Sequence, residues 1–317
     1  MKALSIVVPC YNEEKILRET HQSLMSLLKK LIASGKISEA SNICYVDDGS
    51  QDKTYSLIEE FSQQSNQVSG LKLSKNKGHQ NALLAGLFSV QGDWVVSIDA
   101  DLQDDISAIE PMIKAIQSGS EIVYGVRDDR TTDSIFKRLT AELYYQLLSK
   151  LGVEIIPNHA DYRMMTQRSV SALKDYREVN LFLRGMIPLI GFNSSIVYYK
   201  RGVRLAGESK YPFKKMLSFA WDGVTSMSTT PLRLVTTTGA VVFTITVLLS
   251  LYTLRIRFLT TEAVPGWAST VLPIYFLGGI QILCIGILGE YLGKIYKEVK
   301  ARPRYIVEKT CGENFRN

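Results

Sequence analysis

Three side chains with oxygen donors, Asp99, Asp101 and Gln103, alternate along five residues that directly follow the apolar run 94–98. In an extended chain every second side chain points to the same face, so the three donors would converge on one spot. Hard cations such as Mg²⁺ and Mn²⁺ prefer oxygen ligands and keep water or substrate phosphate in their remaining positions. The spacing therefore predicts a metal site that would neutralise the charge on a departing diphosphate. An isolated D-x-D could also be a turn in which an aspartate caps the next helix.

Carboxylates also follow two other predicted strands, Asp48 after residues 43–47 and Glu13 after residues 4–10. The carboxyl ends of parallel strands meet at one edge of a sheet, where like charges repel unless a cation or a hydrogen-bonding ligand is present. A bound ligand is therefore predicted. Neither G-x-G-x-x-G nor G-x-x-x-x-G-K-[ST] occurs, which disfavours a dinucleotide oxidoreductase and a P-loop NTPase. Taken singly, Glu13 could instead start a helix and Tyr11 could be a packed aromatic.

The elements that must position these residues can be read from residues 1–127, where short β-branched runs alternate with longer amphipathic runs. This pattern is typical of βα units around a mostly parallel sheet. The expected strands cover residues 4–10, 43–47, 71–73, 94–98 and 122–126. The expected helices cover residues 14–31, 54–62, 81–90 and 106–116. Ligands bind such a sheet beyond the carboxyl ends of its strands, which is where the acidic residues fall.

The composition favours a membrane surface over nucleic acid as the partner of this basic chain. Its net charge is +6, but Lys and Arg cluster beside apolar spans and form no single basic tract. Residues 234–254 and 268–289 contain no charged side chain, and each is long enough to meet the ~20 residues needed to cross ~30 Å of hydrocarbon. Two such runs predict two transmembrane helices, although a buried soluble helix would have a similar composition. The segments 135–151 and 212–230 could be helices in the membrane interface or core helices.

The charges around the two spans predict the orientation of the chain. An even number of spans returns the chain to the side on which it starts, and Lys294, Lys297 and Arg302 follow the second span closely. Both termini are therefore expected in the cytoplasm, and the first apolar run is too short for a signal peptide. The four cysteines lack metal-ligand spacing, so they support neither a zinc site nor a disulfide framework.

Six segments occur in one order over most of the part before the spans. They are Val8-Pro9-Cys10-Tyr11-Asn12-Glu13-Glu14, Val46-Asp47-Asp48-Gly49-Ser50, Asn76-Lys77-Gly78, Asp99-Ala100-Asp101-Leu102-Gln103, Asp161-Tyr162-Arg163 and Gly207-Glu208-Ser209-Lys210-Tyr211. Together they resemble the inverting GT-A glycosyltransferases of family 2. The spans, with residues 276–281 and 286–291, resemble the polyisoprenyl-phosphate glycosyltransferase branch, especially the bactoprenol glucosyltransferases.

The resemblance implies an α/β GT-A fold, a domain plan and a donor site. The implied domains are a GT-A glycosyltransferase domain over 1–211, an interfacial helix over 212–232, a two-helix transmembrane region over 233–292 and a basic cytoplasmic tail over 293–317. The implied donor-binding residues are Pro9, Tyr11, Glu13, Asp48 and Asp99. Asp99 would share the Mg²⁺ or Mn²⁺ with Asp101 and Gln103.

The acceptor phosphate is expected to meet positive charge close to the membrane. Arg127, Arg138, Arg204 and Lys210 lie at the edge of the sheet domain or in the approach to the interfacial helix, and similar family positions bind donor or lipid phosphate. Arginine suits phosphate because its planar fork donates two parallel hydrogen bonds. We predict Arg127 and Arg204 as catalytic residues, and Arg138 and Lys210 as ligands of the acceptor phosphate. Each could instead form an ordinary surface ion pair.

Asp161 resembles the carboxylate that the family offers on the acceptor side of the sugar. It could orient the acceptor, act as a base or attack the anomeric carbon itself, or it could simply pair with Arg163 or cap a turn. A phosphate monoester has a second pKa near ~6, so it is already largely ionised at neutral pH and is a competent nucleophile. We therefore expect inversion, with Asp161 as a positioning or base residue. Asp161→Asn should then reduce turnover with little change in stability.

The resemblance implies transfer of a single sugar to undecaprenyl phosphate or another polyisoprenyl phosphate, at the cytoplasmic face of the plasma membrane. UDP-glucose is the first choice of donor, and GDP-mannose, UDP-N-acetylglucosamine or a UDP-aminoarabinose type are the alternatives. The Q-x-x-R-W motif of processive synthases does not occur, which agrees with a single transfer. A catalytically inactive membrane scaffold is the alternative from another class. The implied partners are the nucleotide sugar, the lipid phosphate, the bilayer and a second copy in a homo-oligomer, whereas nucleic acid is not expected.

Overall fold

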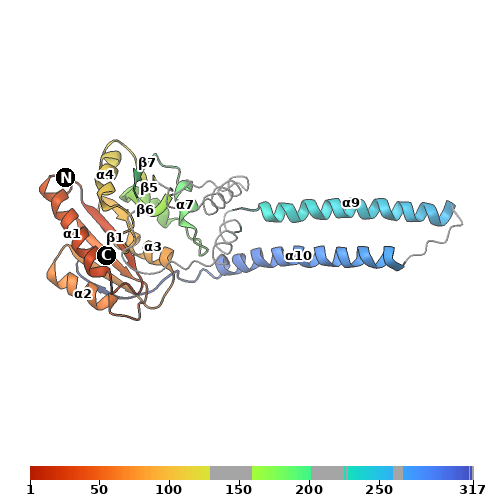
Figure 1. The fold of residues 1–317 in the computed structure, drawn as a ribbon, viewed down its shortest axis with the longest axis horizontal. Coiled ribbons are helices and arrows are strands. Elements are labelled where there is room, and N and C mark those ends of the chain that lie inside the picture. Colours follow the sequence, from red (N-terminus) through yellow and green to blue (C-terminus); the bar gives the residue numbers. More distant parts are fainter. Residues whose placement is uncertain (129–158, 201–224, 226–227, 260–266, 314, 316–317) are drawn as a thin grey trace.

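The computed structural model describes residues 1–128, 159–200, 225, 228–259, 267–313 and 315. An α/β domain lies at one end, and two long helices project from it side by side (Figure 1). The α/β class with a mostly parallel sheet is confirmed. The segment 135–151, most of the segment 212–230, and the predicted site residues Arg138, Arg204 and Lys210 lie outside the described residues.

The described strands form one eight-stranded sheet in the order β7-β5-β6-β4-β1-β2-β3-β8. The strands are β1 (Leu4–Cys10), β2 (Asn42–Asp47), β3 (Val68–Leu73), β4 (Trp94–Ser97), β5 (Ile122–Arg127), β6 (His159–Thr166), β7 (Ser194–Tyr199) and β8 (Val307–Cys311). The pairs β4–β1, β1–β2, β2–β3 and β5–β7 are parallel. Strand β6 is antiparallel to both β4 and β5, and β8 is antiparallel to β3. The carboxyl ends of β1, β2 and β4 therefore lie next to one another.

Helices cover both faces of the sheet. They are α1 (Leu17–Ala33), α2 (Thr54–Gln64), α3 (His79–Ser89), η1 (Ile106–Ala108), α4 (Ile109–Gln117), α6 (Gln167–Lys174) and α7 (Leu183–Leu189). Successive residues of the fully buried strand β1 serve opposite faces, since Ile6 packs in the cluster with α1, α2 and α4, and Val7 packs in the cluster with α3, α6 and α7. A run that is apolar at every position is typical of a central strand covered on both sides. The nine strand and helix ranges expected before residue 127 agree with the structure to within three residues.

The two predicted spans lie in the long helices α9 (Thr230–Leu259) and α10 (Trp267–Val299), of 30 and 33 residues. Large apolar side chains on both are exposed, such as Leu248 at 61% and Ile282 at 74%. Among the described residues one stretch, Phe276–Val299, is long and apolar enough to cross a membrane. Both spans are therefore helical, whereas the crossing of a membrane by two helices stays a prediction.

The predicted tail 293–317 contains structure that the sequence did not indicate. Its first residues continue α10, and β8 then adds an antiparallel strand to β3, with Gly70 opposite Cys311. A side chain at Gly70 would not fit, because its Cβ would lie 2.3 Å from Ile58 and 2.8 Å from the Cys311 sulfur. Four of the five residues of β8 are exposed, so the strand lacks the apolar alternation that sequence analysis relies on.

Candidate active site

The loop that follows β2 joins the start of α3 through Asp48. This carboxylate is 3% exposed, and it accepts the backbone N–H groups of Lys77 at 2.7 Å and Gly78 at 2.8 Å. Burial raises the pKa of Asp48 above its usual range, and the two hydrogen bonds partly offset this. Gly78 has a φ of 88°, a left-handed conformation that glycine adopts without strain. Asp48, which is one of the predicted donor-binding residues, therefore fixes the entry into α3.

The other predicted donor residues surround the end of β1. Pro9 is a buried residue of the strand, and Tyr11 follows it with its side chain 42% exposed at the rim. The backbone N–H of Glu13 donates to the Thr54 hydroxyl at 2.8 Å, which ties this loop to the start of α2. An exposed aromatic ring beside two immobilised loops leaves a free face on which a flat ligand could stack.

The segment with Asp99, Asp101 and Gln103 is a turn, not an extended strand. Strand β4 ends at Ser97, and Leu102 has a φ of 51°, so side-chain alternation does not continue through the segment. The expectation that alternation alone would direct three donors to one spot was wrong for this reason. Within the described part of the chain, no group of three or more His, Cys, Asp and Glu residues is arranged to hold a metal.

The chemistry of the residues around Asp99 nevertheless suits a cation. Burial, together with the negative charges of Asp161, Asp104 and Asp101, raises the pKa of Asp99 to about 6 against the opposing effect of His79. Carboxylates gathered in this way repel one another when ionised, and a divalent cation would relieve the repulsion. The oxygen donors present therefore fit Mg²⁺ or Mn²⁺.

Asp161 lies beside the side chains of Arg163, Arg184 and His79. It accepts a short hydrogen bond from Arg163 and another from Arg184 Nη2 at 3.2 Å. His79 Nε2 lies 3.7 Å from Asp161 Oδ2 and 3.5 Å from Asp99 Oδ1, between the two carboxylates. Burial would raise the pKa of Asp161, but Arg184, Arg163 and His79 outweigh it and hold the pKa well below its usual range. Asp161 is thus ionised and already bonded, and the pairing with Arg163 that the sequence left open is present.

Arg127 belongs to a separate polar network behind the D-x-D turn. Its Nη2 lies 3.2 Å from Asp104 Oδ1, and its Nε donates to the Tyr199 hydroxyl at 3.3 Å. Tyr199 in turn donates to Asp104 at 2.5 Å, and the Asp104 side chain is 1% exposed. This network ties the ends of β5 and β7 to the turn after Gln103.

Sequence reasoning missed four residues of this region, His79, Arg184, Asp104 and Tyr199. His79 directly follows the segment 76–78, so its place at the start of a helix could have been recognised. Arg184 carries no local signal, because it reaches Asp161 from the separate short helix α7.

A sequence profile described as "Glycosyl transferase family 2" matches residues 5–173. The chain belongs to this family. It is a glycosyltransferase with a GT-A-like α/β fold, as the resemblance implied. The chain is 50% identical over 307 residues to the uncharacterized glycosyltransferase YkoT of Bacillus subtilis, covering 96% of this chain and 91% of the relative.

The same comparison finds two relatives named for one reaction. The SfII prophage-derived bactoprenol glucosyl transferase of Shigella flexneri is 38% identical over 308 residues, covering 97% of this chain and 98% of the relative. The prophage bactoprenol glucosyl transferase homolog of Escherichia coli is 36% identical over 307 residues, covering 96% and 98%. These matches include the region of α9 and α10 as well as the α/β domain.

Proposed function

We propose that this family 2 glycosyltransferase moves one sugar from a nucleotide sugar, with UDP-glucose as first choice, to undecaprenyl phosphate or a similar polyisoprenyl phosphate. The observation that carries the proposal is the convergence of Asp48, Asp99 and Asp161 at one edge of the sheet, in a domain continuous with a long exposed apolar helix. The relatives named bactoprenol glucosyl transferase support this acceptor.

The donor nucleotide would lie across the ends of β1 and β2. The exposed ring of Tyr11 would stack on the base, while Pro9 and Glu13 shape the rim of the site. Asp48 would offer its remaining lone pairs to the ribose, since its bonded backbone partners keep it in place. Asp99 would face the diphosphate.

Asp99, Asp101 and Gln103 would hold Mg²⁺ or Mn²⁺. When bound, the ion would supply positive charge that neutralises the diphosphate of the donor. Two features support the fit. All three side chains offer oxygen donors, and the pKa of Asp99 is raised by burial and by neighbouring carboxylates.

The transfer itself needs little proton chemistry. An ionised phosphate oxygen of the acceptor would attack the anomeric carbon as the bond from that carbon to the UDP oxygen breaks, which inverts the anomeric centre. Asp161 is a weak base because Arg184, Arg163 and His79 hold its pKa well below the usual range, so we assign it a positioning role. It would keep Arg184 and His79 beside the reacting groups, where charge and orientation lower the barrier.

Arg127 would support the same site indirectly. It pairs with Asp104, and this ion pair would hold in place the turn that carries Asp101 and Gln103. Arg204 is proposed as a catalytic residue, and Arg138 and Lys210 as ligands of the acceptor phosphate. The α9–α10 pair would place the domain at the cytoplasmic face of the plasma membrane with both termini in the cytoplasm, and self-association through these helices is part of the proposal.

One experiment tests the reaction directly. The purified full chain is incubated with Mg²⁺ or Mn²⁺, undecaprenyl phosphate and each of a panel of radiolabelled nucleotide sugars, and label in the lipid phase is counted. We expect transfer from UDP-glucose. Transfer from GDP-mannose or another UDP-sugar alone would replace the donor, and no transfer from any donor would overturn the proposed function.

A further inference from the structure

Glu298, in the last turn of α10, is bound by the loop that precedes α7. Its two carboxylate oxygens accept the backbone N–H of Val179 at 2.9 and 2.8 Å. Its Oε1 also accepts the backbone N–H of Asn180 at 2.8 Å and the side-chain amide of Asn180 at 2.9 Å. Hydrogen bonds to an ionised acceptor are about twice as strong as neutral ones. We name the contacts of Glu298 with Val179 and Asn180 the α10 clasp.

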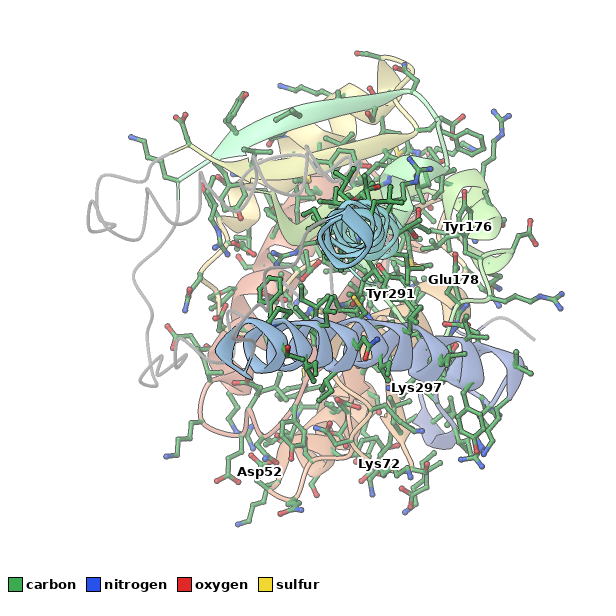
Figure 2. The ribbon with its side chains drawn as sticks, turned by 90° about the vertical axis from the view of Figure 1, so that its right-hand side faces the viewer. Asp52, Lys72, Tyr176, Glu178, Tyr291 and Lys297 are labelled. Carbon is green, nitrogen blue, oxygen red and sulfur yellow. The ribbon has the colours of Figure 1, made fainter. Side chains whose placement is uncertain are left out.

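Other contacts hold the same end of α10 to the α/β domain. The Asn180 amide also approaches the carbonyl oxygen of Lys294 at 3.4 Å, and Arg304 donates to the carbonyl oxygen of Tyr176. Figure 2, turned by 90° from Figure 1, labels Tyr176 and Glu178 of this loop together with Tyr291 and Lys297 of α10. The end of the long helix is therefore attached where the chain leads into α7.

The loop held by the clasp leads directly to the Asp161 cluster. Residue 182 is followed by α7, whose first N–H, from Leu183, donates to Gln80 Oε1 at 2.9 Å. Gln80 is the neighbour of His79 at the start of α3. The next residue of α7, Arg184, donates to Asp161 at 3.2 Å. Arg184, and through Gln80 the start of α3 that carries His79, are therefore connected to the residues that follow the clasp.

Helix α7 cannot fix its own position. It has seven residues, contains Pro188, and begins at Phe182 without a side-chain cap. Helices this short are unstable alone, so their placement comes from the groups that their ends and faces contact. The Arg184 side chain is 44% exposed, and an exposed ion pair does little to hold a helix in place. Leu183, Met186 and Ile187 pack one face of α7 into the core, and the clasp holds the loop that enters its amino end.

We propose that Glu298 is a positioning residue for sugar transfer, because the α10 clasp fixes the start of α7 and keeps Arg184 on Asp161. The seating of α10 against the α/β domain thereby sets the geometry of the acceptor side of the site, in addition to tethering the domain. This inference rests on the proposed function and assigns to it a residue that is remote from the reacting groups.

The test uses the full chain with Glu298→Gln, which keeps the side-chain size but removes the charge and one acceptor oxygen. Glu178→Gln is the matched control, because it removes one carboxylate charge from the loop that Glu298 binds, and Glu178 is exposed. We expect kcat for lipid glycosylation to fall about tenfold in Glu298→Gln, with the donor KM changed less than about twofold. Glu178→Gln should retain both values.

A double variant identifies the route of the effect. Arg184→Ala should lower kcat by itself, and adding Glu298→Gln to it should cause no further loss, because coupled residues give non-additive effects. Losses that multiply in the double variant would overturn the inference, as would a wild-type rate in Glu298→Gln. If Glu298→Gln does not fold, Asn180→Ala replaces it, because it removes the side-chain donor to Glu298. It should lower kcat by less, and it should cause no further loss in the Arg184→Ala background. Losses that multiply in that double variant would also overturn the inference. An inactive wild-type chain would instead refute the proposed function.

Discussion

Replacing Asp161 by asparagine would leave a buried cation without its negative partner. The Arg163 side chain is 0% exposed, and its Nε and Nη1 have no hydrogen-bond partner within the described part of the chain. Burial lowers the pKa of Arg163, and Asp161 opposes this effect. The sequence alone led to the expectation of little change in stability, and the structure reverses it because Arg163 has no access to water.

The size of the effect follows from the burial of the pair. Removing one partner of a buried ion pair costs about 3–5 kcal/mol, and because the asparagine keeps one acceptor oxygen we expect the lower end, about 3 kcal/mol. For a protein of this size each kcal/mol shifts Tm by ~2–4 °C, so Asp161→Asn should lower Tm by ~6–12 °C. Turnover should fall sharply as well, because Arg184 and His79 lose the carboxylate that orients them.

Thermal unfolding of the detergent-purified chain measures this prediction. Arg184→Ala is the control, since its pair with Asp161 is 44% exposed on the arginine side and should contribute less than about 1 kcal/mol. Arg163→Met in the Asp161→Asn background should recover much of the loss, because it removes the unpaired charge. An unchanged Tm in Asp161→Asn would refute the argument and show that Arg163 is compensated by other groups.

The pH dependence of the same contribution has a defined sign. The pKa of Asp161 is lower in the folded chain than its ordinary value of 3.8, so the unfolded chain binds a proton more readily. The stabilisation is therefore complete above about pH 5 and is lost as the pH falls through the folded pKa. Asp161→Asn should converge with the wild type in acid, and a constant Tm difference down to the lowest usable pH would contradict this.

Three further outcomes are expected. Chelation by EDTA should abolish transfer and Asp101→Ala should do the same, and full activity in a chain shown by metal analysis to be free of divalent cations would exclude the metal assignment. Tyr199→Phe should lower the free energy of unfolding by about 1–3 kcal/mol, because buried Asp104 loses a hydrogen bond of 2.5 Å. Chemical denaturation measures this change, and equal free energies for the variant and the wild type would contradict it. Since the folded pKa of Asp99 is about 6 against an ordinary 3.8, its protonated form favours folding and stability should fall as the pH rises from 4 to 6. In Asp99→Asn the fall in stability between pH 4 and 6 should be smaller. Identical curves of Tm against pH for the variant and the wild type would contradict this prediction.

The central strands and helices were predictable because each obeys a local rule. Strand β1 is apolar at every position, and α1 buries residues such as Leu24 and Leu28 at helical spacing. These patterns depend on neighbours in the sequence and on burial, both of which the sequence reports directly. The acidic ends of β2 and β4 could be assigned to one edge for the same reason, since parallel strands align their carboxyl ends.

The remaining features depend on contacts between distant segments. The segment 99–103 was expected to be extended, and it is a turn in which Leu102 adopts a left-handed conformation that leucine rarely shows. Strand β8 lacks apolar alternation, and its assignment comes from pairing with β3 more than two hundred residues earlier. Arg184 and Glu298 likewise owe their roles to tertiary partners, Asp161 and Asn180, that no local pattern identifies.

The pairing of β8 with β3 also constrains the path of the chain through a bilayer. Two strands hydrogen-bonded in one sheet must lie in the same compartment, so the chain between Leu73 and Val307 crosses a membrane an even number of times or not at all. If α10 crosses, then another segment must cross in the opposite direction, and α9 runs beside α10 over a similar length (Figure 1). A single crossing would require breaking the edge of the sheet. If the chain crosses a bilayer, backbone hydrogen bonds therefore keep β8 on the same side as the α/β domain, independently of the distribution of lysine and arginine.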